Sequence, residues 1–540
     1  MPKLFASFLL ILTVFIHIQC RNTNSQNQLV VQQDSTITPQ TAITQLVFDS
    51  VYVDQFIQKH QFMQDTAQRI LNFYISRNFQ YAWFTEDGVA EQTRTFWNLR
   101  NFYITSNRSN LLRDTLFEQS MERILNDSTY QITPEEQANT ELKLTHHFFA
   151  YAQYAYAGTI DPESLQWHIP RKKLDVVALL DSLVTNRGNN LEQWEPVNNV
   201  YMNLQSKLKD YAALDERGGW DTLPVSQKTF SKGNKDSILL KLKQRLAWED
   251  TSFVADSVPE FDEALQNAVN RARARYGMLE NGKADAALVR ELNVSVKKRI
   301  EQILINMERA RWLPPTEGNV LIVANIPDYR LRVFEDNNVV LSMNIVVGTV
   351  ANNSVIFNDE LKYIVFAPYW NVPMSIARNE IVPAMRRNKN YLARNNMEIT
   401  GYNNGIPVVR QKPGKSNSLG LVKFLFPNSY NIYFHDTPSK SLFEREQRAF
   451  SHGCIRLQKP FELAKYLLRN QPEWTEEKMQ QAMNGSKETW VTLPQAIPVM
   501  ITYFTAWVDV DHAIHFNKDV YGHDKKLAAR LFSNTDLTQP

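Results

Sequence analysis

The chain has 540 residues, of which 43% are hydrophobic and 21% are charged, ordinary values for a globular protein. At about 150 residues per domain, this length favours roughly three or four domains. The formal net charge is +2, and no basic stretch has interleaved aromatic residues, so the composition speaks against nucleic acid as a partner.

The N-terminus, MPKLFASFLLILTVFIHIQC, combines one basic residue with an apolar run from Leu4 to Ile18. A membrane-spanning helix needs about 20 apolar residues, so this run better fits the core of an export signal. Cys20 stands where a lipoprotein signal places its acylated cysteine, although the three residues before it fit such a signal poorly. We therefore expect export to the periplasm or cell envelope, with residues 1–20 cleaved, acylated at Cys20, or kept as a membrane tether.

Residues 21–45 are rich in Asn, Gln, Ser and Thr, which predicts a flexible linker. Residues 46–215 are mostly helical in pattern, with clear helical spacing in Phe62–Phe79 and in Leu142–Ala157, where Gly158 is the expected C-cap. Adjacent helical side chains diverge by about 100°, so His146 and His147 are not expected to face one metal ion.

Residues 216–315 form a second predicted helical unit. Its helices are expected over Ser237–Trp248, from Phe261 towards Gly277, and over Val296–Met307, with Pro314 and Pro315 ending the last.

After Pro315 the pattern changes to short β-rich runs such as NVLIVANIP, YRLRVFED and NNVVLSMNIVVG, with a candidate hairpin turn at Asp336-Asn337-Asn338. Helical patterns interrupt them at Ala377–Asn390 and Pro460–Arg469, and the runs TWVTLP and PVMITYFTAWVD predict two closing strands. The chain is therefore predicted to be an α+β multidomain protein, with a β-rich domain over 316–525 and a C-terminal tail over 526–540.

The chemistry is concentrated around Cys454, the one cysteine besides Cys20. It lies in Ser-His-Gly-Cys-Ile-Arg at 451–456, and His435 ends a strand-like run upstream. A free thiol has a pKa of ~8.5, so a histidine that takes its proton makes it a better nucleophile. Backbone N–H groups of Gly453 and Cys454 are candidates to hold an oxyanion, and Asp436 or a backbone carbonyl to orient His435.

Spacing alone leaves other interpretations open. A lone cysteine among apolar residues is usually buried and inert. A zinc site would need a third ligand, and neither an HExxH nor a CxxC pattern is present. A papain-like protease is disfavoured because the candidate histidine precedes the cysteine.

Segment 451–456 with the upstream His435 closely resembles the signature of the L,D-transpeptidase catalytic domain: a histidine, a spacer and [Ser/Thr]-His-Gly-Cys-hydrophobic-[Asn/Arg]. The runs RQKPG at 410–414, KFLFP at 423–427 and HDTPSKSLF at 435–443 resemble the large multidomain Gram-negative branch of that family. The likeness extends to YWNVP at 369–373, ERARWLP at 308–314 and TAWVD at 505–509.

The resemblance implies a helical scaffold domain over 46–215 and a catalytic domain, a mixed β-sandwich, over 316–525 with a capping insertion at about 374–420. Residues 216–315 resemble a peptidoglycan-binding helical module. There Ala272-Arg273 and Asn281-Gly282 replace the usual residues, so glycan binding and a purely structural role both stay open.

The resemblance also assigns roles. Cys454 is the nucleophile, His435 the proton donor and acceptor, Gly453 an oxyanion donor and His452 a supporting residue. Substrate contacts are expected from Arg456, Tyr433, Trp370 and Ser451. A structural ion pair for Arg456, and ordinary core packing for the two aromatic residues, are the alternatives.

The implied reaction cross-links peptidoglycan. Cys454 attacks the third residue of a donor tetrapeptide stem, D-alanine leaves, and the amine of an acceptor stem resolves the thioester into a 3→3 cross-link. No metal or organic cofactor is required, and carbapenems would acylate the cysteine. An L,D-carboxypeptidase, attachment of an envelope protein to peptidoglycan and, more remotely, a non-catalytic peptidoglycan-binding scaffold are the alternatives.

Overall fold

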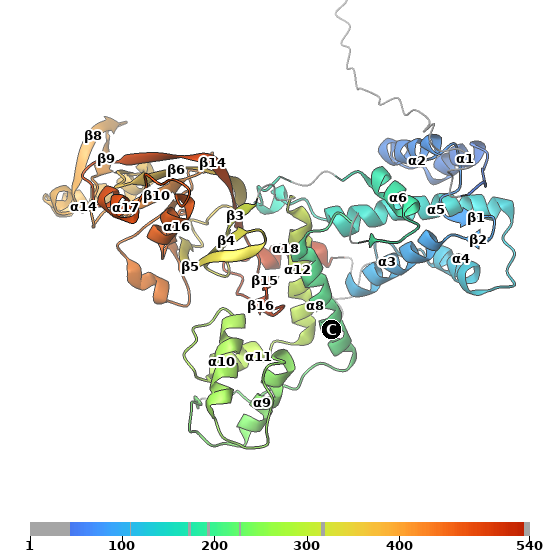
Figure 1. Cartoon of the computed structure of the whole chain (residues 1–540), viewed down its shortest axis with the longest axis horizontal. Coiled ribbons are helices and arrows are strands. Elements are labelled where there is room, and N and C mark those ends of the chain that lie inside the picture. Colours follow the sequence, from blue (N-terminus) through green and yellow to red (C-terminus); the bar gives the residue numbers. More distant parts are fainter. Residues whose placement is uncertain are drawn as a thin grey trace, which may run out of the picture.

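The structure is a computed structural model that describes residues 44–107, 110–170, 174–191, 195–225, 228–314 and 319–533. The predicted export signal, Cys20 and nearly all of the predicted linker lie outside these ranges. Within them, no helix is long and apolar enough to cross a membrane. Three lobes surround two central helices, α8 (Asn199–Glu216) and α12 (Val296–Trp312), which pack along each other (Figure 1).

The N-terminal lobe is helical and has an aromatic core of its own around Trp83, Phe96 and Phe148. His146 packs on Phe62 and His147 on Phe117, with the two imidazoles turned 79° from each other, so both histidines belong to the packing of this lobe. Its elements are α1 (Val51–His60), α2 (Gln64–Ser76), β1 (Phe84–Thr85), β2 (Gly88–Val89), α3 (Glu91–Asn107), α4 (Thr115–Asn126), α5 (Pro134–Ala152), the π-helical turn η1 (Gln153–Ala157), the 3-10 turn η2 (Glu163–Leu165) and α6 (Val176–Thr185).

The second lobe contains α9 (Ile238–Glu249), α10 (Glu263–Arg275) and α11 (Ala286–Leu292), and α12 leaves from it. The side chains of Asp262 and Asp285 cap the N-termini of α10 and α11. Ala272 and Arg273 are buried, and Arg273 Nη1 lies 3.1 Å from Asp285 Oδ2. These two residues therefore stabilise the interior of the module.

The described C-terminal residues form a nine-stranded mixed sheet that closes on itself. β5 pairs with β4 along its first half and with β13 and β12 along its second, so eight strands form a ring and β12 lies outside it. The ring follows the order β5-β13-β11-β10-β6-β14-β3-β4. The strands are β3 (Val320–Asn325), β4 (Arg330–Glu335), β5 (Asn338–Gly348), β6 (Phe357–Phe366), β10 (Val422–Leu425), β11 (Phe434–His435), β12 (Ala449–Ser451), β13 (Ile455–Leu457) and β14 (Thr489–Thr502).

This architecture confirms the α+β multidomain class, and the layer predicted as a sandwich is a closed ring. Asp336 and Asn337 both have positive φ, +48° and +66°, as a tight hairpin turn between β4 and β5 requires. Around the ring lie the 3-10 turn η4 (Lys440–Glu444), α16 (Pro460–Leu467) and α17 (Glu476–Met483).

Two predictions for the C-terminal part were wrong. The runs predicted as two strands form the single strand β14, which has a register shift between Thr492 and Ile497, and their last residues form β15 (Ala506–Val508), which pairs only with β16 (Ile514–Phe516). The predicted tail from residue 526 begins inside α18 (His523–Leu531), whose Leu527 is 1% exposed.

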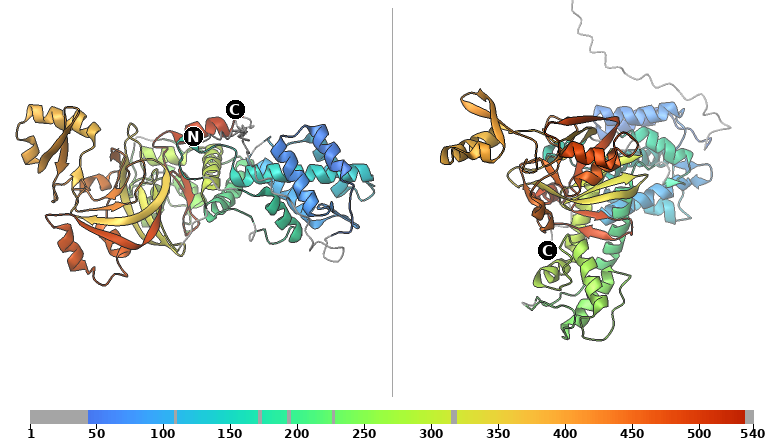
Figure 2. Two further views of the ribbon diagram at one scale, coloured as in Figure 1. Left: turned by 90° about the horizontal axis from the view of Figure 1, so that it is seen from above. Right: turned by 60° about the vertical axis from the view of Figure 1, so that its left-hand side comes forward.

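The insertion folds as a small unit that projects from the ring (Figure 2). Its sheet has the order β7-β9-β8, and its core includes Val372, Ala377, Ile381 and Val409. Its elements are β7 (Trp370–Asn371), α13 (Met374–Ile376), the π-helical segment η3 (Ala377–Ile381), α14 (Val382–Arg387), α15 (Tyr391–Arg394), β8 (Met397–Asn403) and β9 (Ile406–Gln411).

The helix α12 connects the lobes, and every residue from Ile303 to Trp312 is buried. Glu308 is paired with Arg311 at 2.8 Å and accepts hydrogen bonds from the N–H groups of Thr159 and Ile160 in the first lobe. Arg309 lies 2.6 Å from Asp524 of α18. The motif at 308–314 is thus a helix end that fixes the first lobe and the C-terminal helix to one another.

Candidate active site

Two short parallel strands place the candidate residues. In the pairing of β11 with β13, Phe434 lies opposite Ile455 and His435 opposite Arg456. Side chains alternate between the faces of a strand, and Phe434 and Ile455 are fully buried in the core. His435 and Arg456 therefore share the opposite face.

Tyr433 and Cys454 extend the same face, since each precedes its core residue by one position. The Tyr433 side chain lies close enough to the Cys454 thiol to lower its pKa, and the Tyr433 ring centroid lies 5.7 Å from that of His435. The Cys454 thiol also faces the carbonyl oxygen of Asn431 at 3.5 Å. The thiol, the imidazole and the guanidinium of Arg456 are thus gathered on one surface.

The backbone carbonyl of Asp436 orients the imidazole. His435 is 4% exposed, and its Nδ1 lies 2.5 Å from that carbonyl oxygen. A proton on Nδ1 donates to this carbonyl and leaves the lone pair of Nε2 free. The Asp436 carboxylate accepts from the Lys440 ammonium and from the Leu421 N–H instead, so the carbonyl, and not the carboxylate, has the orienting role.

Burial determines the protonation of the pair. It lowers the pKa of His435 to about 3, and the nearby Arg456 guanidinium adds to this shift. Burial also raises the pKa of the Cys454 thiol, against the opposing influence of Tyr433 and Arg456. Near neutral pH the resting pair is therefore a thiol and a neutral imidazole.

The loop before Cys454 is held by Ser451. Gly453 has φ +115°, which favours glycine, and its N–H donates to Ser451 Oγ at 3.2 Å while that hydroxyl donates to the Cys454 carbonyl at 2.5 Å. Ser451 is buried and positions the loop, and its expected contact with substrate stays a prediction. The Gly453 N–H, one of the two expected oxyanion donors, is occupied by this bond, whereas the Cys454 N–H, the other, has no hydrogen-bond partner among the described residues.

Two residues that the sequence did not reveal support this loop. The Ser354 hydroxyl donates to the Gly453 carbonyl at 2.7 Å and accepts from the Gly348 N–H at 2.9 Å. The Tyr521 hydroxyl donates to the Gly348 carbonyl at 2.7 Å and accepts from the Ser354 N–H at 3.3 Å. Both residues are buried, and no local motif marks either one.

The remaining candidates have distinct surroundings. His452 is exposed, and its Nε2 lies 3.0 Å from Glu380 of η3, so it links the cysteine loop to the insertion. Arg456 makes no ion pair with any residue that the structure describes, and its Nε is buried without a hydrogen-bond partner. Trp370 packs against the core of the insertion. This position agrees with ordinary core packing, the alternative to a substrate contact for this residue. Within the described ranges, no three His, Cys, Asp or Glu residues form a group that could hold a metal ion.

Two parts of the chain match known protein domains. Residues 319–493 match the L,D-transpeptidase catalytic domain, and residues 68–208 match a scaffold domain. A Haemophilus influenzae protein assigned to the L,D-transpeptidases is 30% identical over 243 residues, which are 42% of this chain and 49% of that protein. The chain thus spans about half the length of this relative.

Two solved structures show similarity at low identity. An L,D-transpeptidase from Stackebrandtia nassauensis is 13% identical, with 52% of this chain and 97% of that one covered and a TM-score of 0.21. An L,D-transpeptidase in complex with imipenem is 13% identical, with 34% and 59% covered and a TM-score of 0.19.

The fold and the matched domains define a multidomain protein with a scaffold domain and an L,D-transpeptidase catalytic domain. Over these two domains, the chain is similar to members of the L,D-transpeptidase family.

Proposed function

We propose that this protein is a peptidoglycan L,D-transpeptidase that works through a thioester on Cys454. The observation that carries the proposal is the pairing of β11 with β13, since it brings His435 and Arg456 to the face on which Cys454 lies. The match of residues 319–493 to the catalytic domain supports the same reaction.

In the first half-reaction, the Cys454 sulfur attacks the carbonyl carbon of the third residue of a donor tetrapeptide. Because the resting thiol is neutral, Nε2 of His435 takes its proton as the sulfur–carbon bond forms. The Cys454 N–H stabilises the oxyanion. The carbon–nitrogen bond then breaks, the imidazolium protonates the leaving amine of D-alanine, and a thioester remains.

In the second half-reaction, the side-chain amine of an acceptor stem attacks the thioester. The imidazole accepts a proton from this amine and returns it to the departing sulfur, so the thiol is restored and a 3→3 cross-link forms. Water in place of the amine gives the L,D-carboxypeptidase reaction. Arg456 suits a substrate carboxylate, because its planar donors match a carboxylate and it has no ion-pair partner among the described residues.

The proposal includes the location and the inhibitor class. Peptidoglycan lies outside the cytoplasmic membrane, so the enzyme acts in the cell envelope after export through residues 1–20, with or without a lipid on Cys20. A carbapenem carbonyl takes the place of the donor carbonyl and acylates Cys454; imipenem is the probe of choice because a family member has been solved in complex with it.

Intact-protein mass spectrometry with imipenem tests the proposal. Wild type is expected to gain one drug-sized adduct and the Cys454→Ala variant none, with circular dichroism confirming that both are folded. Folded wild type without an adduct would refute acylation of this thiol. Incubation with a purified disaccharide tetrapeptide is expected to give a dimer with loss of one D-alanine; a tripeptide monomer alone would identify a carboxypeptidase.

A further inference from the structure

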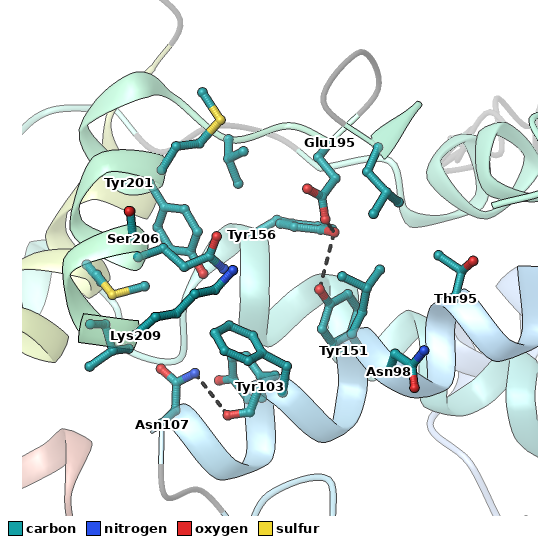
Figure 3. Close-up of a pocket in the computed structure, with 18 of the residues that line it drawn as sticks. Thr95, Asn98, Tyr103, Asn107, Tyr151, Tyr156, Glu195, Tyr201, Ser206 and Lys209 are labelled. Carbon is teal, nitrogen blue, oxygen red and sulfur yellow. Dashed lines mark hydrogen bonds between the residues drawn. The ribbon is translucent and has the colours of Figure 1, made fainter. Parts of the chain in front are cut away.

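A cavity of about 930 Å³ lies between the N-terminal lobe and α8 (Figure 3). Residues of α3 line one side and residues of α8 the other, while Tyr151 of α5 and Tyr156 of η1 contribute between them. Its volume falls within the range of small-molecule sites, about 300–1,000 Å³. None of the lining residues comes from the catalytic domain, so this cavity is separate from the cysteine site.

The lining combines aromatic rings with amides and is nearly balanced in charge. Among the described residues, one carboxylate, Glu195, and one ammonium, Lys209, line it. The rings belong to Phe102, Tyr103, Tyr151, Tyr156 and Tyr201, and the amides to Asn98, Asn107, Asn189, Asn190 and Gln205.

Three polar groups of this lining, those of Tyr151, Tyr156 and Glu195, are linked by hydrogen bonds. The Tyr156 hydroxyl donates to Glu195 Oε1 at 2.5 Å, and the Tyr151 hydroxyl lies 3.4 Å from that of Tyr156. Tyr156 belongs to a π-helical turn, a distortion that is frequent at functional sites. Gly158 ends the turn at φ +85°, where a Cβ would lie 2.6 Å from Glu308 Oε1, so the turn is anchored on α12.

This lining excludes two ligand classes. A ligand with several charges would lack counter-charges, and burying such charges unpaired is unfavourable. A purely apolar ligand would cover the amides and hydroxyls without offering hydrogen bonds, which costs about 1–3 kcal/mol for each buried group left unpaired. An uncharged sugar avoids both costs. Its C–H face packs on an aromatic ring, and its hydroxyl and acetamido groups form hydrogen bonds with side-chain amides.

We propose that this cavity is a binding site for a neutral oligosaccharide, specifically a strand of N-acetylated amino sugars. The oligosaccharide class follows from the lining; the choice of amino sugars rests on the proposed function, because such strands form the glycan of peptidoglycan. The site would hold the glycan between α3 and α8, whereas the second lobe, where Ala272 and Arg273 are buried, has a structural role at these positions.

Isothermal titration calorimetry on the full chain carrying Cys454→Ala tests this site without turnover. The probe is the β-1,4-linked tetramer of N-acetylglucosamine. We expect saturable binding that weakens at least tenfold in Phe102→Ala combined with Asn98→Ala, and likewise in Gln205→Ala. The matched control is Asn203→Ala, on α8 but outside the lining, which is expected to change the affinity less than twofold. Thermal midpoints show that each variant is folded.

Each other outcome contradicts a defined part of the proposal. Absence of saturable binding, or equal affinity in the cavity variants and wild type, would overturn the site. Competition by a free tetrapeptide stem would show that the ligand of this cavity is a peptide and not an oligosaccharide. Equal affinity for maltotetraose would overturn the amino-sugar assignment. Imipenem acylation of Cys454 is a separate measurement, so failure of glycan binding and failure of the proposed catalysis are distinguishable.

Discussion

Cys454 and His435 are held as neutral groups by the low polarity of their surroundings, which opposes the charge of either ion. In the reaction we propose, proton transfer therefore accompanies the attack of the sulfur instead of preceding it. The carbonyl of Asp436 contributes by fixing the tautomer, since it accepts a hydrogen bond from Nδ1–H and leaves Nε2 unprotonated.

The pH dependence of imipenem acylation should reveal this neutral pair. The lowered pKa of His435, about 3, means that the imidazole remains a base as the pH falls through the ordinary histidine range. The second-order acylation rate is expected to stay nearly constant from pH 7 down to pH 5 and to fall only nearer pH 3. Stopped-flow fluorescence gives the rate, and circular dichroism at each pH monitors the fold. A half-point near pH 6.5, at full folding, would contradict a lowered histidine pKa.

Replacing Arg456 tests its role towards a substrate carboxylate. A hydrogen bond to a charged group is worth about 1.5–3 kcal/mol, so Arg456→Gln is expected to lower kcat/KM for the tetrapeptide about tenfold or more, mainly through KM. Lys459→Gln, an exposed change three residues away, is the control and should have little effect. An unchanged KM with a lower thermal midpoint would instead indicate a structural role.

Much of the site could be predicted from the sequence, but only where its residues lie in one motif. Cys454 and His435 stand in a recognisable segment. Ser354 and Tyr521 do not: the Ser354 bond to the loop spans 99 residues of sequence and the Tyr521 bond to Ser354 spans 167. The choice between the carbonyl and the carboxylate of Asp436 depends on backbone direction, which residue identity does not encode.

At the scale of elements, two segments support the cysteine loop. One is β5 with the turn that follows it, and the other is the stretch before α18. Tyr521, in the stretch before α18, is hydrogen-bonded to Gly348 and Ser354 of the first segment. The C-terminal segment therefore supports the backbone of the loop that contains Cys454.

Tyr521→Phe tests this support because it removes only a hydroxyl. Loss of a net hydrogen bond of about 0.5–1.5 kcal/mol is expected to slow imipenem acylation roughly two- to tenfold. Ser354→Ala should have a similar effect, and the double variant should be less than additive, since both act on one network. Tyr402→Phe, at an exposed position of the insertion, is the control. Full additivity would show that the two residues act independently.

Regular elements could be predicted where periodicity is local. The helices around residues 64–76 and 263–275 follow their apolar spacing. The single strand β14 could not be foreseen, because Pro494, Gln495 and Ala496 look like a loop and the register shift between Thr492 and Ile497 absorbs them within one strand. The ring closes because β5 pairs with β4 along its first half and with β13 and β12 along its second. Nothing in the sequence of β5 predicts this change of partners.

At the scale of the whole molecule, the second lobe, α12 and the catalytic ring share one continuous hydrophobic core, and the N-terminal lobe has another. The two cores meet at α12, where Arg311 Nε donates to the Ala155 carbonyl at 2.8 Å and Glu308 accepts from Thr159 and Ile160. The predicted domain boundary at 315 therefore comes directly after α12, a helix that packs against more than one lobe.

Removing the Glu308 carboxylate should disrupt this junction. Glu308→Ala leaves the Arg311 charge buried without its partner, which is expected to cost about 3–5 kcal/mol of unfolding free energy. Glu301→Ala, on the same helix, breaks a pair with the 69%-exposed side chain of Lys298 and should cost less than about 1 kcal/mol. Denaturant unfolding followed by tryptophan fluorescence measures both. Equal effects would show that the junction does not depend on Glu308.

Closure of the ring also limits how the catalytic domain can associate with other chains. Strands at the margin of an open sheet present unpaired N–H and C=O groups, which act as templates for aggregation. Each of the eight ring strands has a partner on both sides over at least part of its length, whereas β12 pairs on one side only and Thr489–Thr492 of β14 pair only with β6. Most of the ring is therefore protected from intermolecular strand pairing by its topology.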